Sequence, residues 1–197
     1  MTGPHVLPFL PAFVPRELCD TVGVDPTQPG AIATCVDIVR TDVGGDGVSA
    51  RGASPEQVAA LQQVVTDARD DGIDLKIVVM DRNPAIDTPL RDVATEVGEA
   101  YPDSTVLVLS PSYAGTYSTT FDRATLEAGQ DLAKTGDPVQ SSANFVSQLE
   151  TGDFPWTALT IVLVVGVLAA TVATRLLQIR SKCARADKTA ESTVRQA

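Results

Sequence analysis

The chain has 197 residues, of which 44% are hydrophobic, and its 25 acidic and 15 basic residues give a formal net charge of −10. An acidic protein is repelled by nucleic acids and by anionic lipid surfaces, so nucleic-acid binding is excluded from the expected functions. A compact unit of about 110 residues is long enough to bury its own core.

Residues 1–28 are rich in proline and lack hydrophobic periodicity, which predicts an extended N-terminal lead-in. Its first fifteen residues contain four prolines and no basic residue before Arg16, so they lack the form of a cleavable signal peptide. The lead-in also holds His5, the one histidine of the chain. Histidine-based metal clusters and Ser-His-Asp arrangements are therefore not expected unless His5 folds back into a site.

Residues 29–150 have the pattern of an α/β domain. Apolar residues at helical spacing predict a first helix from Ala31 to Val43, with Ile32 on its apolar face and the glycine-rich residues 44–47 ending it. Ser54, followed by Pro55 and by Gln57 three residues on, has the form of a capping box and predicts a second helix. The β-branched run from Leu75 to Met80 predicts a strand.

The second half of this domain repeats the helix-then-strand order. Thr88 and Pro89 open a helix, and the apolar run from Thr105 to Leu109 predicts a second, buried strand. Residues 113–121 favour an edge strand, and helices are predicted over 122–134, with Leu126 and Leu132 inward, and over 138–149. Short connections between alternating helices and strands predict the α/β class, with a small, mostly parallel sheet flanked by helices.

Residues 154–177 are predicted to form one C-terminal transmembrane helix. No charged residue occurs from Phe154 to Thr174, and at about 1.5 Å per residue such a helix spans roughly 30 Å, the hydrocarbon thickness of a bilayer. Trp156 and Arg175 stand at its two ends, where they would anchor it at the membrane interfaces. The alternative, a buried helix of a soluble core, would be expected to carry a polar stripe.

Two small residues of this helix, Gly166 and Ala170, have the spacing that permits close approach of two helices. Dimerisation through this pair is one interpretation. Alanine is so frequent in the segment that chance explains the spacing equally well.

Charge is distributed unevenly about the helix: residues 1–153 carry a formal charge of −14 and residues 154–197 a charge of +4. Because basic residues near a span are retained in the cytoplasm, we expect residues 178–197 to be a basic cytoplasmic tail and the domain to be extracytoplasmic, at the cell membrane. The rival topology is a tail-anchored protein whose domain lies in the cytoplasm.

Two cysteines, Cys19 and Cys35, fall in the acidic N-terminal part. In an oxidising compartment they are able to form a disulfide, and closing a loop of this length stabilises a protein by about 3 kcal/mol in the chain-entropy account. The alternative is a pair of unbonded, partly buried thiols.

Polar residues follow directly after both predicted strands: Asp81 and Arg82 after the first, and Ser110, Ser112 and Tyr113 after the second. Ligands of open parallel sheets lie beyond the carboxyl ends of the strands, so these side chains form a candidate ligand or metal site. Asp81 with hydroxyl oxygens suits a divalent cation, and Arg82 suits an anion. Otherwise these residue types act only as turn formers.

The chain also resembles a known group of proteins. Residues 54–61, 71–80 and 106–110, followed by a C-terminal span, are similar to a small single-pass membrane-protein family of actinobacteria and, more distantly, to the TPM domain. The resemblance covers roughly residues 30–180 and is one of pattern and order. It implies an α/β domain held outside the membrane. Phosphatase, photosystem-repair and assembly roles are associated with different members, and none carries over to particular residues here.

These observations favour a non-enzymatic interaction or accessory protein of the cell envelope. Its partners would be the lipid bilayer and another envelope protein, with no cofactor required. The alternative is a weak, metal-assisted hydrolase of the phosphatase type, using water bound to a divalent cation near Asp81 and Ser110.

Overall fold

The structure is a computed structural model that describes residues 13–151 and 156–194, with side chains over 13–151 and 159–178. His5 therefore lies outside the described residues. The chain divides into two units, Met1–Thr151 and Gly152–Ala197, which are described separately. In chain order the elements are α1 (Arg16–Val22), α2 (Ala31–Asp46), β1 (Val48–Ser49), α3 (Pro55–Asp70), β2 (Leu75–Val79), α4 (Thr88–Ala100), β3 (Thr105–Leu109), β4 (Ala114–Tyr117), α5 (Arg123–Leu132), α6 (Pro138–Glu150) and α7 (Trp156–Val194).

A four-stranded sheet in the order β1-β2-β3-β4 forms the centre of the first unit. The strands β1, β2 and β3 are parallel, and β4 pairs antiparallel with β3. The expected α/β class, with a mostly parallel sheet flanked by helices, is confirmed. Each parallel connection contains a helix, as the geometry of parallel strands requires.

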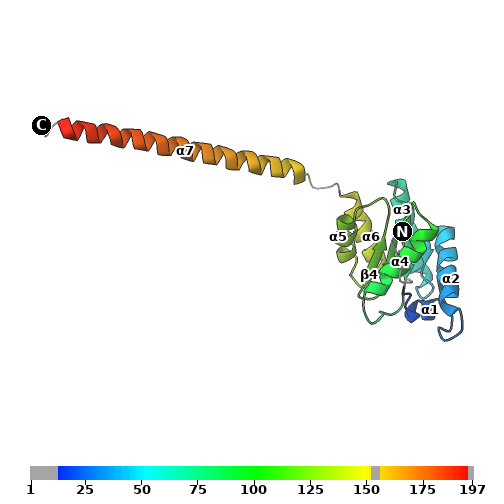
Figure 1. Cartoon of the computed structure of the whole chain (residues 1–197). Helices are drawn as coiled ribbons and strands as arrows, with labels where there is room; N and C mark the ends of the chain where they lie inside the picture. The colour runs from blue at the N-terminus through cyan, green and yellow to red at the C-terminus, as the bar shows by residue number, and fades with distance from the viewer. Residues whose placement is uncertain (1–12, 152–155, 195–197) are drawn as a thin grey trace, which may run out of the picture. The chain divides into compact units, whose positions relative to one another are not determined.

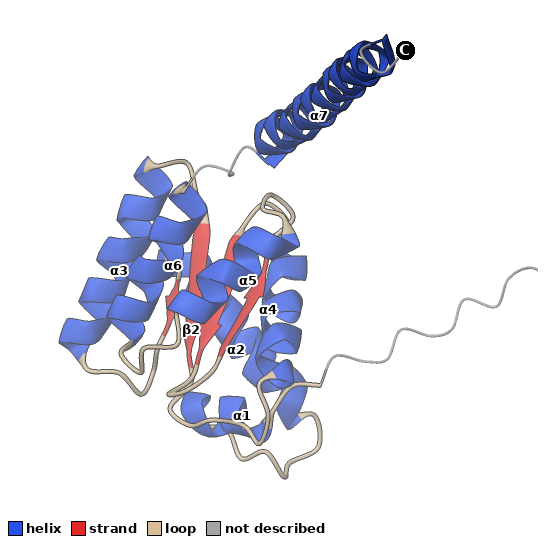
Figure 2. Ribbon diagram, turned by 90° about the vertical axis from the view of Figure 1, so that its left-hand side faces the viewer, coloured by secondary structure: helices blue, strands red, loops and turns tan. Residues whose placement is uncertain are grey.

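Helices cover both faces of this sheet (Figures 1 and 2). Side chains alternate along each strand, so Ile77 and Leu107 contact a core beneath α3, α5 and α6, while Val78 and Val108 contact a second core beneath α1, α2 and α4. Burial on both faces explains why the strands are apolar almost throughout. Phe145 of α6 is among the largest fully buried side chains.

Local sequence signals account for several helix ends. The Ser54 hydroxyl accepts a hydrogen bond from the Gln57 amide, and the Gln57 side chain accepts one from the Ser54 amide, which completes the predicted capping box of α3. Helix α2 ends at Gly47, whose φ of 85° is the left-handed conformation that favours glycine. It therefore runs through Gly44 and Gly45, three residues beyond the predicted end at Val43.

Three expectations are corrected by the structure. Residues Arg16–Val22 form α1 rather than extended chain, because Leu18 and Cys19 are buried in the core with α2 and α4. Ile32 and Leu132, both expected to face inward, are 37% and 49% exposed. The two-residue strand β1 has no counterpart among the predicted elements, since a pair of residues is too short to show periodicity.

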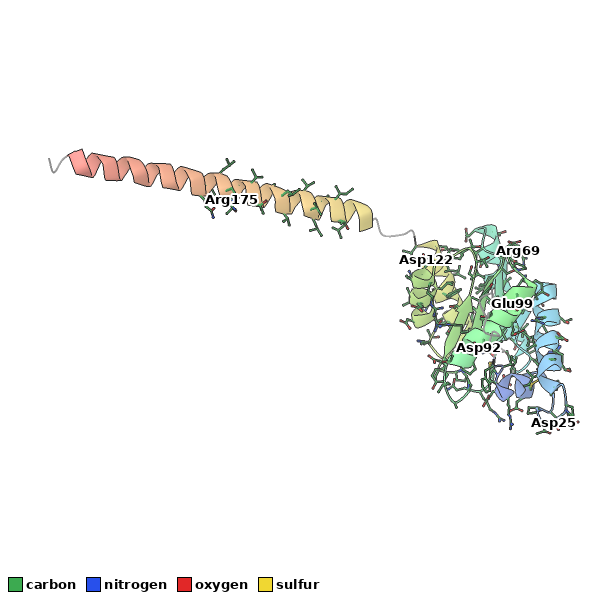
Figure 3. All side chains as sticks on the ribbon, viewed as in Figure 1. Asp25, Arg69, Asp92, Glu99, Asp122 and Arg175 are labelled. Carbon is green, nitrogen blue, oxygen red and sulfur yellow. A yellow bond between two sulfur atoms is a disulfide. The ribbon has the colours of Figure 1, made fainter. Side chains whose placement is uncertain are left out.

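The second unit contains α7, a single helix of 39 residues. Its segment Leu159–Gln178 has a mean hydropathy of 2.2 and is long and apolar enough to cross a membrane. Arg175 falls inside this segment, near its C-terminal end, and its side chain extends away from the helix (Figure 3). The backbone of α7 remains helical through Val194, so most of the expected basic tail continues the same helix.

Candidate functional site

Three loops meet at the carboxyl edge of the parallel strands, the place where open α/β sheets bind ligands. Residues 50–54 follow β1, residues 80–87 follow β2 and residues 110–113 follow β3. Strands β2 and β3 are direct neighbours, with Val79 opposite Leu109 in the last pair of the register. The strand adjacency on which the predicted site depends is therefore present.

Asn83 connects two of these loops. Its carboxamide oxygen accepts hydrogen bonds from the Ser110 hydroxyl and from the Ser112 amide, each at 2.8 Å, and its nitrogen donates to the Ser112 hydroxyl at 3.0 Å. The Ser110 amide also donates to the Tyr113 carbonyl at 2.9 Å, closing the turn into β4. Both serines of the predicted site are thus used to hold the loops together.

Asp81 is placed by contacts on two sides. Its amide donates to the Thr21 hydroxyl of α1 at 3.2 Å, which ties the end of β2 to the N-terminal helix. Its carboxylate lies against the main chain of Gly52: a Cβ atom added to Gly52 would lie only 1.9 Å from Oδ1 of Asp81. Glycine is the one residue that leaves room for this carboxylate.

A cavity of about 160 Å³ opens at this edge, lined by Asp81 and Ser110 together with residues at the beginnings of α3 and α6. Two of these neighbours already have partners. The Gln57 side chain is part of the α3 cap, and the Ser141 hydroxyl pairs with the Thr135 hydroxyl at 2.7 Å. The carboxylate of Asp81 is the one acidic group on the cavity wall within the described part of the chain.

Only some of the predicted site residues lie at this cavity. Asp81 and Ser110 line the cavity, whereas Arg82, Ser112 and Tyr113 do not. Arg82 is exposed, and Tyr113 packs against the core beneath α1, α2 and α4. Over residues 13–151 and 159–178, no three His, Cys, Asp or Glu side chains cluster closely enough to hold a metal ion.

Sequence reasoning missed three residues that shape this edge, namely Gly52, Asn83 and Thr21. Asn83 follows β2 within the same run as Asp81, and its residue type is frequent in turns, so its position was visible in the sequence. Gly52 gave no such signal, because the strand that precedes it was not recognisable. Thr21 reaches the site from a helix that the sequence did not predict.

Cys19 and Cys35 form a disulfide that joins α1 to α2, with a Cα–Cα distance of 5.2 Å. Both residues have no solvent exposure and belong to the core beneath α1, α2 and α4. The bond fastens α1 to the domain, and α1 in turn supplies the Thr21 hydroxyl that holds Asp81.

Comparison with known proteins identifies the family to which the chain belongs. The membrane protein Rv1476 of Mycobacterium tuberculosis is 52% identical over 185 residues, which cover 92% of this chain and 89% of that protein. A solution NMR structure of the N-terminal domain of the cg2496 protein from Corynebacterium glutamicum aligns with a TM-score of 0.44 and 15% identity, over 56% of this chain and 85% of that one. The family profile described as membrane protein Rv1476 matches residues 12–189, a range that contains α1 to α6 and most of α7. The chain belongs to the Rv1476 membrane protein family.

Proposed function

We propose that this membrane protein acts by binding another protein of the cell envelope through its acidic α/β domain, and that it catalyses no reaction. The domain would be held outside the cytoplasmic membrane by the span at Leu159–Gln178, with the basic segment that follows in the cytoplasm.

The observation that carries this proposal is that the polar side chains at the carboxyl edge form hydrogen bonds to one another and so hold the loops together. Asn83 engages the Ser110 hydroxyl and both the amide and the hydroxyl of Ser112. A serine nucleophile needs an adjacent base that takes its proton, whereas the Ser110 hydroxyl donates to an amide oxygen, which is no base. These polar residues therefore stabilise the loops by hydrogen bonding, the role that polar turn residues commonly have.

Two observations support an extracytoplasmic domain. The disulfide between Cys19 and Cys35 is a bond that persists in oxidising compartments and is rare in the cytosol. The formal charge of −14 before residue 154 and +4 after it agrees with retention of the basic side in the cytoplasm.

A second candidate function is a metal-assisted phosphatase, as in some proteins that carry the TPM domain. The observation that favours it is the Asp81 carboxylate on the wall of a cavity of about 160 Å³, which has room for a small hydrated ion. Ser110 lines the same cavity, so a phosphoester bound there would lie beside both residues.

One assay separates the two functions. The full chain in detergent micelles is incubated with p-nitrophenyl phosphate and Mg²⁺, Mn²⁺ or Ca²⁺, alongside the folded variant Asp81→Asn. The interaction function predicts no turnover above the buffer rate by either protein. Turnover by the parent chain that is abolished by Asp81→Asn, while Glu99→Gln on the exposed end of α4 leaves it unchanged, would establish the phosphatase instead.

We also propose that the span self-associates through Gly166 and Ala170. Within the described residues, and leaving aside the backbone of α7 itself, no group lies within 4 Å of a Cβ added at Gly166, so that surface is open to a second helix. Gly166→Ile should reduce cross-linked dimer in membranes, and Gly166→Ala should preserve it. Equal dimer in the isoleucine variant and the parent would contradict this contact.

A further inference from the structure

The outer edge of β4 carries the main chain of Thr116, a residue that is 7% exposed and lines a cavity. The hydrogen bond from the Ser110 amide to the Tyr113 carbonyl fixes the alternation of the antiparallel ladder. With Gly115 opposite Val108, Gly115 faces β3, and the main chain of the next residue, Thr116, faces outward. The ladder therefore gives the Thr116 main chain no partner on β3, and outside the ladder no hydrogen bond within residues 13–151 reaches its amide or carbonyl, although its side chain donates to Gln130 at 3.3 Å.

A cavity of about 340 Å³ lies beside this edge, between α4 and α5. Thr116 and the next residue line the cavity from β4, and the residue after them lines it just beyond the strand. Arg91 lines it from α4, and Arg123 and Glu127 line it from α5. Phe121, in the loop before α5, adds an aromatic side chain to the wall. The cavity thus combines a strand edge, an apolar surface and charged groups, which is the combination that extended peptides use when they add to a sheet.

The charge of this cavity is opposite to that of the domain as a whole. Arg123 Nε donates to Glu127 Oε1 at 2.7 Å, and Arg91 Nη2 lies 3.8 Å from the same oxygen atom. Two guanidinium groups therefore share one carboxylate and leave a local charge of about +1 in a strongly acidic domain. Because these side chains are 41% to 59% exposed, their ion pairs contribute little stability and are easily exchanged for another carboxylate.

The neighbouring acidic residues of α4 face elsewhere. Asp92 accepts a hydrogen bond from the Phe13 amide at 3.0 Å, and Glu96 pairs with Arg40 of α2 at 2.8 Å. Neither lines the cavity, so the excess positive charge is not compensated from the same helix.

We propose that the edge of β4 binds an extended peptide segment of the partner protein, with a Glu or Asp side chain of that segment bound by Arg91. The peptide would pair with the outward main chain of Thr116, and its carboxylate would compete with Glu127 for the two guanidinium groups. This inference rests on the proposed interaction function and assigns the surface and the class of partner.

The test uses the full chain in nonionic detergent micelles and fluorescent heptapeptides of alternating Val and Thr with one central Glu. Matched peptides carry Gln at that position. The Glu peptides should bind saturably, should bind more tightly than the Gln peptides, and should slow hydrogen exchange of the Thr116 amide. Anisotropy gives the affinity, and exchange measured by NMR gives the location.

Two variants should change the affinity in opposite directions. Arg91→Gln should weaken binding of the Glu peptides by about five-fold, the size expected for one exposed charge pair. Glu127→Gln removes the competing carboxylate and should strengthen binding by a similar factor. Arg69→Gln removes one positive charge on α3, which contacts β1 and β2 at the other side of the sheet, and should leave binding unchanged (Figure 3).

Several outcomes would overturn the proposal. These are no saturable binding at millimolar peptide, equal affinity for Glu and Gln peptides, no effect of Arg91→Gln, or protection of Thr116 by anionic phospholipid vesicles but not by peptides. The proposed interaction function is tested separately: an envelope protein that still cross-links to the Arg91→Gln chain would show that the interaction exists and that it uses another surface.

Discussion

At the scale of single residues, close contacts between side chains and main chain determine the shape of the carboxyl edge. The Asp81 carboxylate is accommodated only because residue 52 has no Cβ atom. At Gly45, inside α2, no described atom outside the helix's own backbone lies within 4 Å of the position that a Cβ would take. These two glycines provide a matched pair, one at a crowded position and one at an open position.

Gly52→Ala should lower the free energy of unfolding by about 1 kcal/mol, because the Asp81 carboxylate must rotate away from the new methyl group. In an Asp81→Ala chain the same substitution should cost nothing, since the crowded atoms are gone. Gly45→Ala should raise stability by about 1 kcal/mol through helix propensity alone. Urea unfolding of the parent, the two single variants at Gly52 and Asp81 and their double variant gives the coupling energy between the two positions. An equal cost of Gly52→Ala in both backgrounds would contradict the contact.

A second residue-scale feature is the carboxylate of Asp74, the residue just before β2. Burial raises its pKa, but donors from Ser104 and from Lys76, whose Nζ lies 3.1 Å from Oδ1, outweigh burial and hold the pKa below its ordinary value. Lys76 itself is buried, and its ammonium group lies 5.4 Å from the centre of the Tyr101 ring. A carboxyl group whose pKa is lowered on folding stabilises the protein above its unfolded pKa, and this contribution is lost as the pH falls through the folded value.

Asp74→Asn should therefore reduce stability at pH 7 and make the loss of stability below about pH 4 shallower than in the parent. The pKa of Glu150 shifts in the opposite direction, because desolvation and the nearby Asp71 raise it. Its contribution falls as the pH rises, so Glu150→Gln should increase stability at pH 7. Urea unfolding at pH 3 and pH 7 checks both. A parent-like pH profile in Asp74→Asn would show that this carboxylate is not involved.

At the scale of elements, α1 is held in place by one covalent bond and by burial of Leu18, Cys19 and Val22. A seven-residue helix is too short to be stable alone, so its presence depends on these contacts. Through Thr21 the helix also supports Asp81, which links the disulfide to the geometry of the carboxyl edge.

The double variant Cys19→Ala, Cys35→Ala should be less stable than the parent by about 3 kcal/mol, because the open loop has more freedom in the unfolded chain. Reductant present during equilibrium unfolding should lower the parent to nearly the same stability. Cys183→Ala, in the basic segment after the span, should change nothing. Unaltered unfolding of the double variant would mean that the bond does not stabilise the domain.

The secondary structure shows which elements local sequence can specify. The helices α3 and α4 and the strands β2 and β3 were predictable because capping residues and periodic apolar residues act within a few positions of one another. The helix α1 and the strand β1 were not, because both are short and owe their structure to burial against distant parts of the chain. The exposure of Leu132 could not be predicted either. Helical spacing shows which face of a helix is apolar, but it does not show how far the neighbouring helix covers that face.

At the scale of the whole molecule, the side of the membrane on which the domain lies can be tested with single cysteines. An exposed cysteine on the domain, introduced as Ala128→Cys in α5, can be compared with the native Cys183 beyond the span. Cys19 and Cys35 are buried and bonded to each other, so they do not react.

With a membrane-impermeant maleimide, Ala128→Cys should be labelled in intact cells, and Cys183 only after lysis. This pattern follows from retention of the basic side in the cytoplasm. Labelling of Cys183 in intact cells, with Ala128→Cys protected until lysis, would place the domain in the cytoplasm. The Cys183→Ala chain carrying Ala128→Cys serves as the control that separates the two signals.

The candidate site shows the same division between local and tertiary information. The rule that ligands lie beyond the carboxyl ends of parallel strands points to the loops after β2 and β3, and Asp81 and Ser110 of these loops line one cavity. Which side chains meet there was decided by contacts from elsewhere: Gly52 makes room for Asp81, and Asn83 takes both serines as partners. Arg82, adjacent in sequence, does not line the cavity at all.

The sequence by itself determined the candidate membrane span, the α/β class and the asymmetry of charge, because hydrophobic length, short-range periodicity and net charge are properties of consecutive residues. Only the tertiary structure decided that Cys19 meets Cys35, that Asn83 fastens the carboxyl edge, and that Arg91 and Arg123 share one carboxylate beside the edge of β4. Each of these contacts joins residues that are brought together only when the elements pack, and the burial of both sheet faces is what drives that packing.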